Sequence, residues 1–205
     1  MPLSVKKLDG RSLRALAHPL RMRIVASLRH DGPATATLLA ERLGESSGLT
    51  SYHVRVLAEN GFVDEATDRG TGRERWWRAA QDMTSWRPED FRDDPDEQEA
   101  EEWLTGYAGR RGMEWLDDWL QRRPKAAPEW AAAADVSDYT LDVTPAELRA
   151  LVTEISEVVL RHREAALSAP RATGDGDGER QSVRLLVYGF PRPPEEQHQG
   201  RADDG

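Results

Sequence analysis

The fold is decided by the stretch from Ala34 to Arg78, which reads ATATLLAERLGESSGLTSYHVRVLAENGFVDEATDRGTGRERWWR. Its first part has the apolar spacing of two short helices, and Gly44 is placed to end the first in the left-handed conformation and to start a tight turn. Its second part predicts a hairpin, with strands over 62–67 and 73–78 joined by a turn over 68–72. This order of elements is typical of a winged helix-turn-helix.

The helix expected over 47–60 has two different faces. Thr50, His53, Val54 and Leu57 recur at the spacing that packs a helix on its neighbours. Small and polar residues fall on the other side, near the amino end with which a recognition helix enters the DNA major groove.

Basic side chains complete a candidate DNA surface. Arg55 suits a guanine edge or a phosphate, Tyr52 suits a phosphate, and the arginines of the wing over 68–75 suit backbone or minor-groove contacts. The alternative is that these arginines form an ordinary solvated strand face. The candidate DNA contacts are Ser47, Gly48, Thr50, Ser51, Tyr52, Arg55, Arg69, Arg73 and Arg75.

The residues before this stretch predict two scaffold helices. Asp9 can cap a helix that runs to about Ala17, and His18-Pro19 then breaks the pattern. The second helix starts at this proline and ends near Asp31-Gly32. Thr35 is the expected cap of the next helix, and Ser46 or Ser47 that of the recognition helix.

Charge is divided unevenly along the 205 residues, whose net charge is −9. Residues 1–80 hold 13 Lys and Arg against 9 Asp and Glu, whereas residues 81–205 hold 15 against 28. A basic half joined to an acidic half fits a protein that meets phosphate at one end only, although ordinary surface variation gives the same pattern. The chain shows no membrane span or signal peptide and has no cysteine, so we expect a cytoplasmic location.

The carboxy-terminal half predicts a different architecture. A long helix should start at Asp94-Pro95 and stop before Pro124, and a second should run over 144–164 between strands at 139–143 and 182–190 that pair with each other. The expected fold class is α+β, mainly α. The expected organisation is a winged helix-turn-helix domain over 1–80, a linker over 81–94, a dimerisation or effector region over 95–190 and a disordered tail over 191–205.

Seven tryptophans are a high load for this length, and six of them lie between Trp77 and Trp130. One interpretation is that large aromatic side chains fill a thin core where long helices dock on the winged domain. The other is a pocket for a small apolar or cationic effector. Its candidate residues are Trp103, Tyr107, Trp115 and Trp119.

Four segments of the first 80 residues resemble the ArsR-type winged-helix family of bacterial repressors. They are LRALAHPLRMRIVASL, LLAERLGES, GLTSYHVRVLAENGFV and GRERWWR, which start at Leu13, Leu38, Gly48 and Gly72. The resemblance implies a homodimer that binds a partly palindromic operator and usually blocks transcription. By position, Ser47, Gly48, Ser51, Tyr52 and Arg55 correspond to the family's recognition face, and Arg69 and Arg73 to its wing.

Two departures from the family's pattern matter. Metal-sensing members carry cysteine-containing pairs or His/Asp ligands, whereas the corresponding region here, Ala34 to Leu38, has no cysteine, and the five histidines lack paired ligand spacing. We therefore expect no metal, no other cofactor and, for His18 and His53, a structural role. The 125 residues after the wing resemble extensions of actinobacterial helix-turn-helix regulators of unassigned effector.

No nucleophile–base set or phosphate loop stands in a supporting context, so we find no candidate catalytic residues and do not expect an enzyme. Asp175-Gly176-Asp177-Gly178 lacks the later glutamate of a calcium loop and suggests a flexible turn. The expected function is a sequence-specific, dimeric DNA-binding regulator that represses transcription. The expected partners are double-stranded DNA, a second copy and a small-molecule effector, without a membrane. The alternative is a winged-helix protein-interaction module without specific DNA binding.

Overall fold

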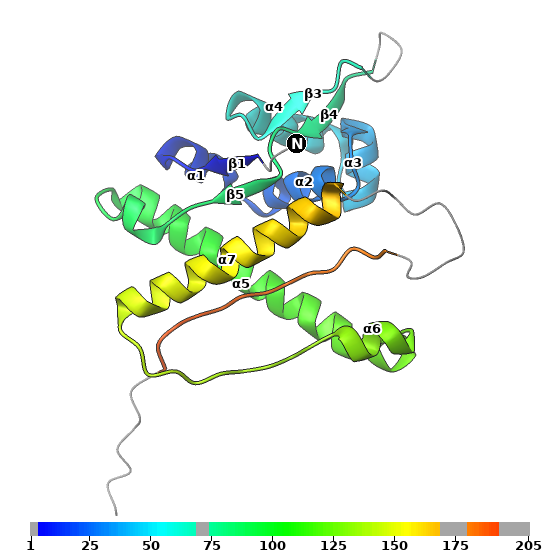
Figure 1. Ribbon diagram of the computed structural model, residues 1–205. Coiled ribbons are helices and arrows are strands. Elements are labelled where there is room, and N and C mark those ends of the chain that lie inside the picture. The colour runs from blue at the N-terminus through cyan, green and yellow to red at the C-terminus, as the bar shows by residue number, and fades with distance from the viewer. Residues whose placement is uncertain (1–3, 69–73, 169–179, 193–205) are drawn as a thin grey trace, which may run out of the picture. The chain divides into compact units, whose positions relative to one another are not determined.

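The computed structural model describes residues 4–68, 74–168 and 180–192 (Figure 1). It is mainly helical with small sheets, which confirms the expected fold class. The chain divides into two compact units, Met1–Asp135 and Val136–Gly205. None of the described helices has a stretch long and apolar enough to cross a lipid bilayer.

The two scaffold helices lie where the sequence predicts them. Helix α1 spans Gly10–Leu16, and the Asp9 carboxylate caps it by accepting a hydrogen bond of 2.8 Å from the Ser12 amide. Helix α2 spans Pro19–His30. His18 caps α2, because its Nδ1 accepts a hydrogen bond of 3.1 Å from the Leu20 amide. The predicted break at His18-Pro19 is therefore confirmed. His18 also caps the helix that follows the break.

The helix-turn-helix is formed by α3 (Ala36–Leu43) and α4 (Ser47–Glu59). The side chain of Thr35 caps α3 and that of Ser46 caps α4, each by accepting a backbone hydrogen bond. Gly44 has φ of 68°, the left-handed value that the sequence predicts for it. These local predictions are confirmed.

A three-stranded antiparallel sheet follows the helix-turn-helix. Strands β3 (Val63–Glu65) and β4 (Trp76–Ala79) form the predicted hairpin, and each is shorter than expected. The third strand, β2 (Ala34–Thr35), pairs with β4 on the side away from β3 and was not predicted. The sheet thus ties the wing to the residue that caps α3.

The segment 81–94, expected as a linker, is instead part of the first unit. Its strand β5 (Met83–Ser85) pairs in parallel with β1 (Val5–Lys7). The short 3₁₀ helix η1 (Pro88–Phe91) follows, and its Phe91 ring is buried in the core. Both strands have only three residues and lie far apart in the chain, so no local sequence pattern predicts their pairing.

Helix α5 (Pro95–Arg122) begins at the predicted cap, Asp94, and stops before Pro124. It packs on α1, where Arg14 forms an ion pair of 2.8 Å with Glu97, and it buries Leu104 completely. Two short helices that were not predicted complete the unit, η2 (Arg123–Lys125) and α6 (Pro128–Ala133). Since α5 shares the core of the winged elements, the expected domain boundary after residue 80 is corrected to one near residue 135.

The core of this unit joins helices α1 to α5 and η1 to the hairpin. Leu13 and Leu16 come from α1 and Ile24 from α2, while Phe62 and Trp77 come from the hairpin region. The buried tryptophan supports the interpretation that at least part of the aromatic load serves packing.

The second unit holds helix α7 (Pro145–Ser168), which confirms the predicted helix and extends it by about one turn. The expected strands at 139–143 and 182–190 are not formed, because neither segment has a hydrogen-bonded strand neighbour in the described residues. Their apolar side chains are exposed, as for Tyr139 and Phe190. The Asp175–Gly178 turn and most of the expected tail lie outside the described residues.

Gly44 and Gly48 provide a matched test of the turn. A Cβ added at either position meets nothing within 4 Å, so the two sites differ in backbone conformation rather than in space. Gly44→Ala should lower the free energy of unfolding by about 1 kcal/mol, because alanine must adopt the left-handed conformation. Gly48→Ala, in the first turn of α4, should leave it unchanged or raise it slightly.

Urea denaturation followed by circular dichroism measures both variants. Equal losses of stability in Gly44→Ala and Gly48→Ala would contradict the left-handed turn.

Candidate nucleic-acid interface

Helix α4 presents one face to solvent. Ser47, Gly48, Tyr52 and Arg55 are exposed and Ser51 is half-buried, so five of the six predicted contacts on this helix lie at the surface. Tyr52 is 56% exposed although its ring is large. The side chains near the amino end are small, which lets the helix approach another surface closely.

Thr50 is the exception among the predicted contacts on α4. Its side chain is 0% exposed and packs inward with His53 and Val54, so it cannot face DNA. Its helical spacing with these residues already indicated the packing side. Thr50 is therefore removed from the candidate contacts.

Leu49 is a surface residue that the sequence reasoning missed. It is 44% exposed beside the Ser46 cap, and its amide donates the capping hydrogen bond of 3.3 Å to the Ser46 hydroxyl. An exposed aliphatic side chain at the amino end of such a helix suits the methyl group of thymine. The only sign of this exposure in the sequence was that Leu49 stands among small and polar residues in the first turn of α4.

Arg55 is free to meet a ligand. Its Nε donates a hydrogen bond of 3.3 Å to the Ser51 carbonyl, and no described carboxylate forms an ion pair with it. Its guanidinium thus lies along the exposed face of α4 without a charge partner in the described chain.

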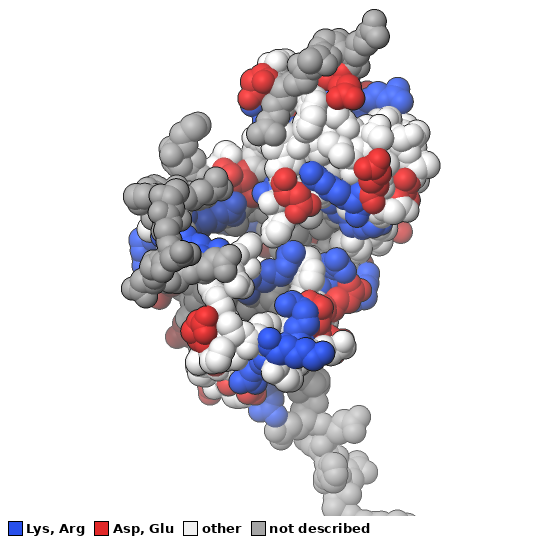
Figure 2. Space-filling model, turned by 90° about the vertical axis from the view of Figure 1, so that its right-hand side faces the viewer, with Lys and Arg blue, Asp and Glu red and all other residues white. Residues whose placement is uncertain are grey.

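The wing is described only at its base, because Arg69 and Arg73 lie outside the described residues. Arg75 lies 3.3 Å from Glu65, measured from Nε to Oε2, and its guanidinium also covers the Trp77 ring at 5.7 Å. Arg78 and Asp68 form a second, longer pair of 3.9 Å. Figure 2 shows acidic side chains interspersed with basic ones over the winged elements at the top of the molecule. The wing base is thus partly neutralised.

Two histidine side chains, His18 and His53, pack together on the inner side of α4. The rings of His18 and His53 lie 4.3 Å apart, and the Tyr52 ring meets His53 edge-on at 5.1 Å. Burial lowers the pKa of both histidines below the ordinary value. The neighbouring charge of Arg21 lowers both further, whereas Glu45 opposes the shift at His53. This burial agrees with the structural role expected for both residues.

Several polar atoms in this region have no hydrogen-bond partner within the described part of the chain. They are Arg21 Nε, Thr50 Oγ1 and His53 Nδ1, all buried around the inner face of α4. A buried polar atom without a partner costs stability, so these three atoms offset part of what the packing of α4 contributes.

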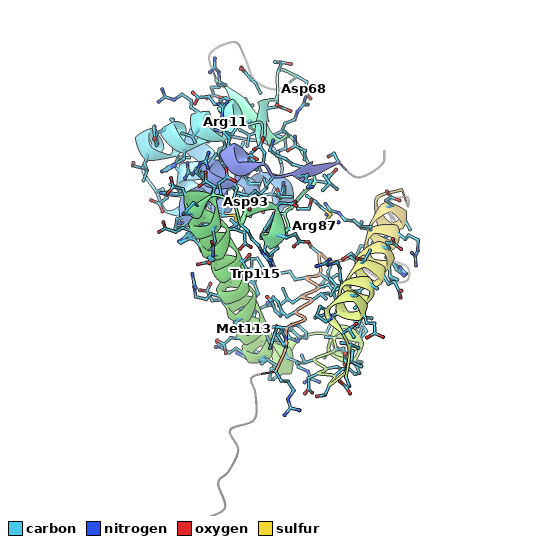
Figure 3. All side chains as sticks on the ribbon, turned by 90° about the vertical axis from the view of Figure 1, so that its left-hand side faces the viewer. Arg11, Asp68, Arg87, Asp93, Met113 and Trp115 are labelled. Carbon is cyan, nitrogen blue, oxygen red and sulfur yellow. The ribbon has the colours of Figure 1, made fainter. Side chains whose placement is uncertain are left out.

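The predicted aromatic pocket is brought together in part. Trp103 and Tyr107 stack at 5.1 Å, and Trp115 is covered by the Arg111 guanidinium at 5.3 Å. Trp119, one turn further along α5, is half-buried. Met113 and Trp115 lie on the half of α5 that leads away from Arg11 and Asp68 of the winged elements (Figure 3). Among the described residues, no group of three His, Cys, Asp or Glu side chains is arranged to hold a metal ion.

The histidine pair predicts that stability depends on pH. Because folding lowers the pKa of both histidines, the unfolded chain takes up protons first as the pH falls below about 6.5. The free energy of unfolding should therefore fall between pH 7.5 and pH 5.5, by up to about 1 kcal/mol.

His53→Gln should reduce this pH dependence, since it removes one of the two titrating rings and keeps a polar side chain. Urea denaturation of both proteins at the two pH values makes the comparison. A slope that is the same with and without His53 would exclude its part in the effect.

Comparison with known proteins identifies the same part of the chain. Residues 16–66 match the family model described as a helix-turn-helix domain. No curated protein matches the chain. Among solved structures, reduced HlyU from Vibrio cholerae N16961 is similar at 25% identity and a TM-score of 0.30, over 34% of this chain and 68% of that one.

A second solved structure is the homodimeric winged helix-turn-helix DNA-binding domain of a possible ArsR-family transcriptional regulator from Mycobacterium bovis. It is similar at 18% identity and a TM-score of 0.31, over 55% of this chain and 80% of that one. The helix-turn-helix match supports a DNA-binding role in transcriptional regulation for residues 16–66.

Proposed function

We propose that this protein is a sequence-specific DNA-binding transcriptional regulator that acts as a homodimer and represses transcription. Helix α4 enters the major groove, and the wing lies against the neighbouring backbone. The observation that carries the proposal is the exposed face of α4, which combines small residues at its amino end with an arginine that has no charge partner among the described residues.

The α4 face provides both kinds of contact that DNA recognition needs. Ser47 and Gly48 allow the helix backbone to come close to the groove floor, and Tyr52 extends toward a phosphate. Arg55 is long enough to reach a guanine edge, where its fork of donors matches the O6 and N7 acceptors. Leu49 adds an apolar contact for a thymine methyl group.

The wing base contributes affinity rather than sequence preference. Arg75 must exchange the carboxylate of Glu65 for a phosphate when DNA binds, so its net gain is smaller than that of an unpaired arginine. This exchange makes binding through the wing depend on salt but not on base sequence.

Repression and dimerisation follow the resemblance of the first 80 residues. Two copies of α4 one helical turn of DNA apart read a palindromic operator, and an occupied operator excludes polymerase. The competing interpretation, a protein-interaction module, predicts weak DNA binding without sequence preference.

Arg55→Ala tests base recognition. The full-length protein first selects fragments from a genomic DNA library, and fluorescence anisotropy then measures affinity for a selected fragment and for a scrambled one. Arg55→Ala should weaken binding to the selected fragment by about tenfold or more and change binding to the scrambled fragment much less. Arg122→Ala, an exposed arginine at the end of α5, is the control.

Failure to enrich any fragment, with no affinity difference between selected and scrambled DNA, would favour the interaction module. Selective binding that Arg55→Ala leaves intact would instead show that α4 docks in another orientation.

Glu65→Gln tests the wing base in the direction of a gain. Removing the carboxylate frees Arg75 for phosphate, so affinity for selected and scrambled fragments should rise together, by about two- to fivefold. Arg75→Ala should lower both and reduce the slope of log affinity against log salt by about one. Glu129→Gln, on α6, controls for the change in net charge. Unchanged affinity in both wing variants would place the base of the wing away from DNA.

A further inference from the structure

A basic cavity lies between α2 and α5, apart from the α4 face. It has a volume of about 360 Å³, within the range of small-molecule sites. Arg23 of α2 forms one wall, and Tyr107, Arg110, Arg111 and Glu114 of α5 form the other. The four α5 residues recur at helical spacings of three and four, which places them on one face of the helix. We call this site the arginine cavity.

The charges of the arginine cavity do not balance. Arg111 is paired with Glu114, and Arg23 lies 2.9 Å from Glu45. Arg110 forms no ion pair with any described carboxylate, so one positive charge remains without a counter-charge. An arginine in a concave site is a strong donor for an oxyanion, because its fork can make two parallel hydrogen bonds.

The cavity also has a flat aromatic wall. The Tyr107 ring stacks on Trp103 with an angle of 15° between the planes. The Arg111 guanidinium is held over Trp115, which fixes the position of its charge. A planar ring can lie against such a wall while its acidic group reaches the arginines.

We propose that the arginine cavity binds a small organic oxyanion, a carboxylate or a phosphate carried on a planar ring. Arg110 takes the anionic group, Arg111 and Arg23 share its charge, and the Tyr107 ring takes the planar part. Three arginines make the site unfavourable for the cationic effector that the tryptophan pattern suggested. Only Tyr107 of the four residues expected in that pocket lines the cavity.

Arg23 connects the cavity to the turn before the recognition helix. Its guanidinium donates hydrogen bonds to the Leu43 carbonyl and to the Glu45 carboxylate, on either side of Gly44. An anion in the cavity competes with these acceptors for Arg23, so its binding loosens the hold on the turn. By linkage, any ligand that needs the turn held in place weakens the anion equally. The effect on DNA rests on the proposed function, whereas binding of the anion does not.

Titration of the full-length protein with benzoate, phenyl phosphate and benzamide tests the site. The tryptophan indole N–H signals in NMR spectra report binding, since Trp103 and Trp115 each contact a residue that lines the cavity. Trp103→Phe assigns the signal of Trp103. At about 10 mM, a concentration that fills even a millimolar site, either anion should shift these signals and benzamide should not.

Two variants locate the anion and its competitor. Arg110→Gln should weaken binding of the anions about tenfold, because it removes a charge-assisted hydrogen bond. Glu45→Gln should tighten it a few-fold, because it releases Arg23 from its acceptor. Arg122→Gln, an exposed arginine three turns further along α5, should change nothing.

The outcomes separate the site from its coupling to DNA. Equal shifts by all three probes, no shift by either anion, or equal binding to wild type and Arg110→Gln would overturn the oxyanion site whether or not the protein binds DNA. Anion binding that Glu45→Gln leaves unchanged would overturn the competition for Arg23. With a selected fragment in hand, benzoate or phenyl phosphate should weaken DNA binding of the wild type but not of Arg110→Gln, and equal weakening of both would overturn the coupling.

Discussion

The structure depends on one backbone constraint, the left-handed residue at Gly44. It ends α3 and turns the chain so that Ser46 can cap α4 immediately afterwards. The inner face of α4, with Val54 and Leu57, then meets α2 and the hairpin, and the opposite face is left to solvent. A residue that resists this conformation would change the angle of α4, and with it every contact that the exposed face can make.

Features that depend on residues close together in the sequence could be predicted. Features that depend on contacts between distant segments could not. Caps such as Asp9, Thr35 and Ser46, and the stop at Gly44, are fixed by side chains within a few residues. The β1–β5 pairing joins segments 78 residues apart in the register of Val5 and Met83, and no local pattern encodes it. Likewise, the apolar residues at 139–143 and 182–190 suggested strands, but apolar character does not supply the hydrogen-bonded neighbour that a strand requires. In the candidate site, helical spacing identified most of the exposed face of α4 and already placed Thr50 on the packing side, but it did not identify Leu49 as exposed.

Carboxylates govern the positive charge of this protein more than its arginine count suggests. Glu65 holds Arg75 at the wing, Glu45 holds Arg23 at the turn, and Glu97 holds Arg14 against α5. Each of these pairs is exposed enough to exchange partners at small cost. Arg55 and Arg110 differ, since neither has a described acidic partner, and they lie in the two places where a ligand is proposed. The described acidic residues thus leave Arg55 and Arg110 without an ion pair at the two proposed ligand sites.

The segment that matches the helix-turn-helix family is much smaller than the unit that folds. Residues 16–66 carry the reading helix, but the core that seats it also takes Leu8 and Leu13 from before the match and Trp77, Phe91 and Leu104 from after it. The matched segment alone therefore does not contain a complete hydrophobic core. Here α5 completes the core with its near half, so its far half can carry the arginine cavity without exposing the residues that seat α4.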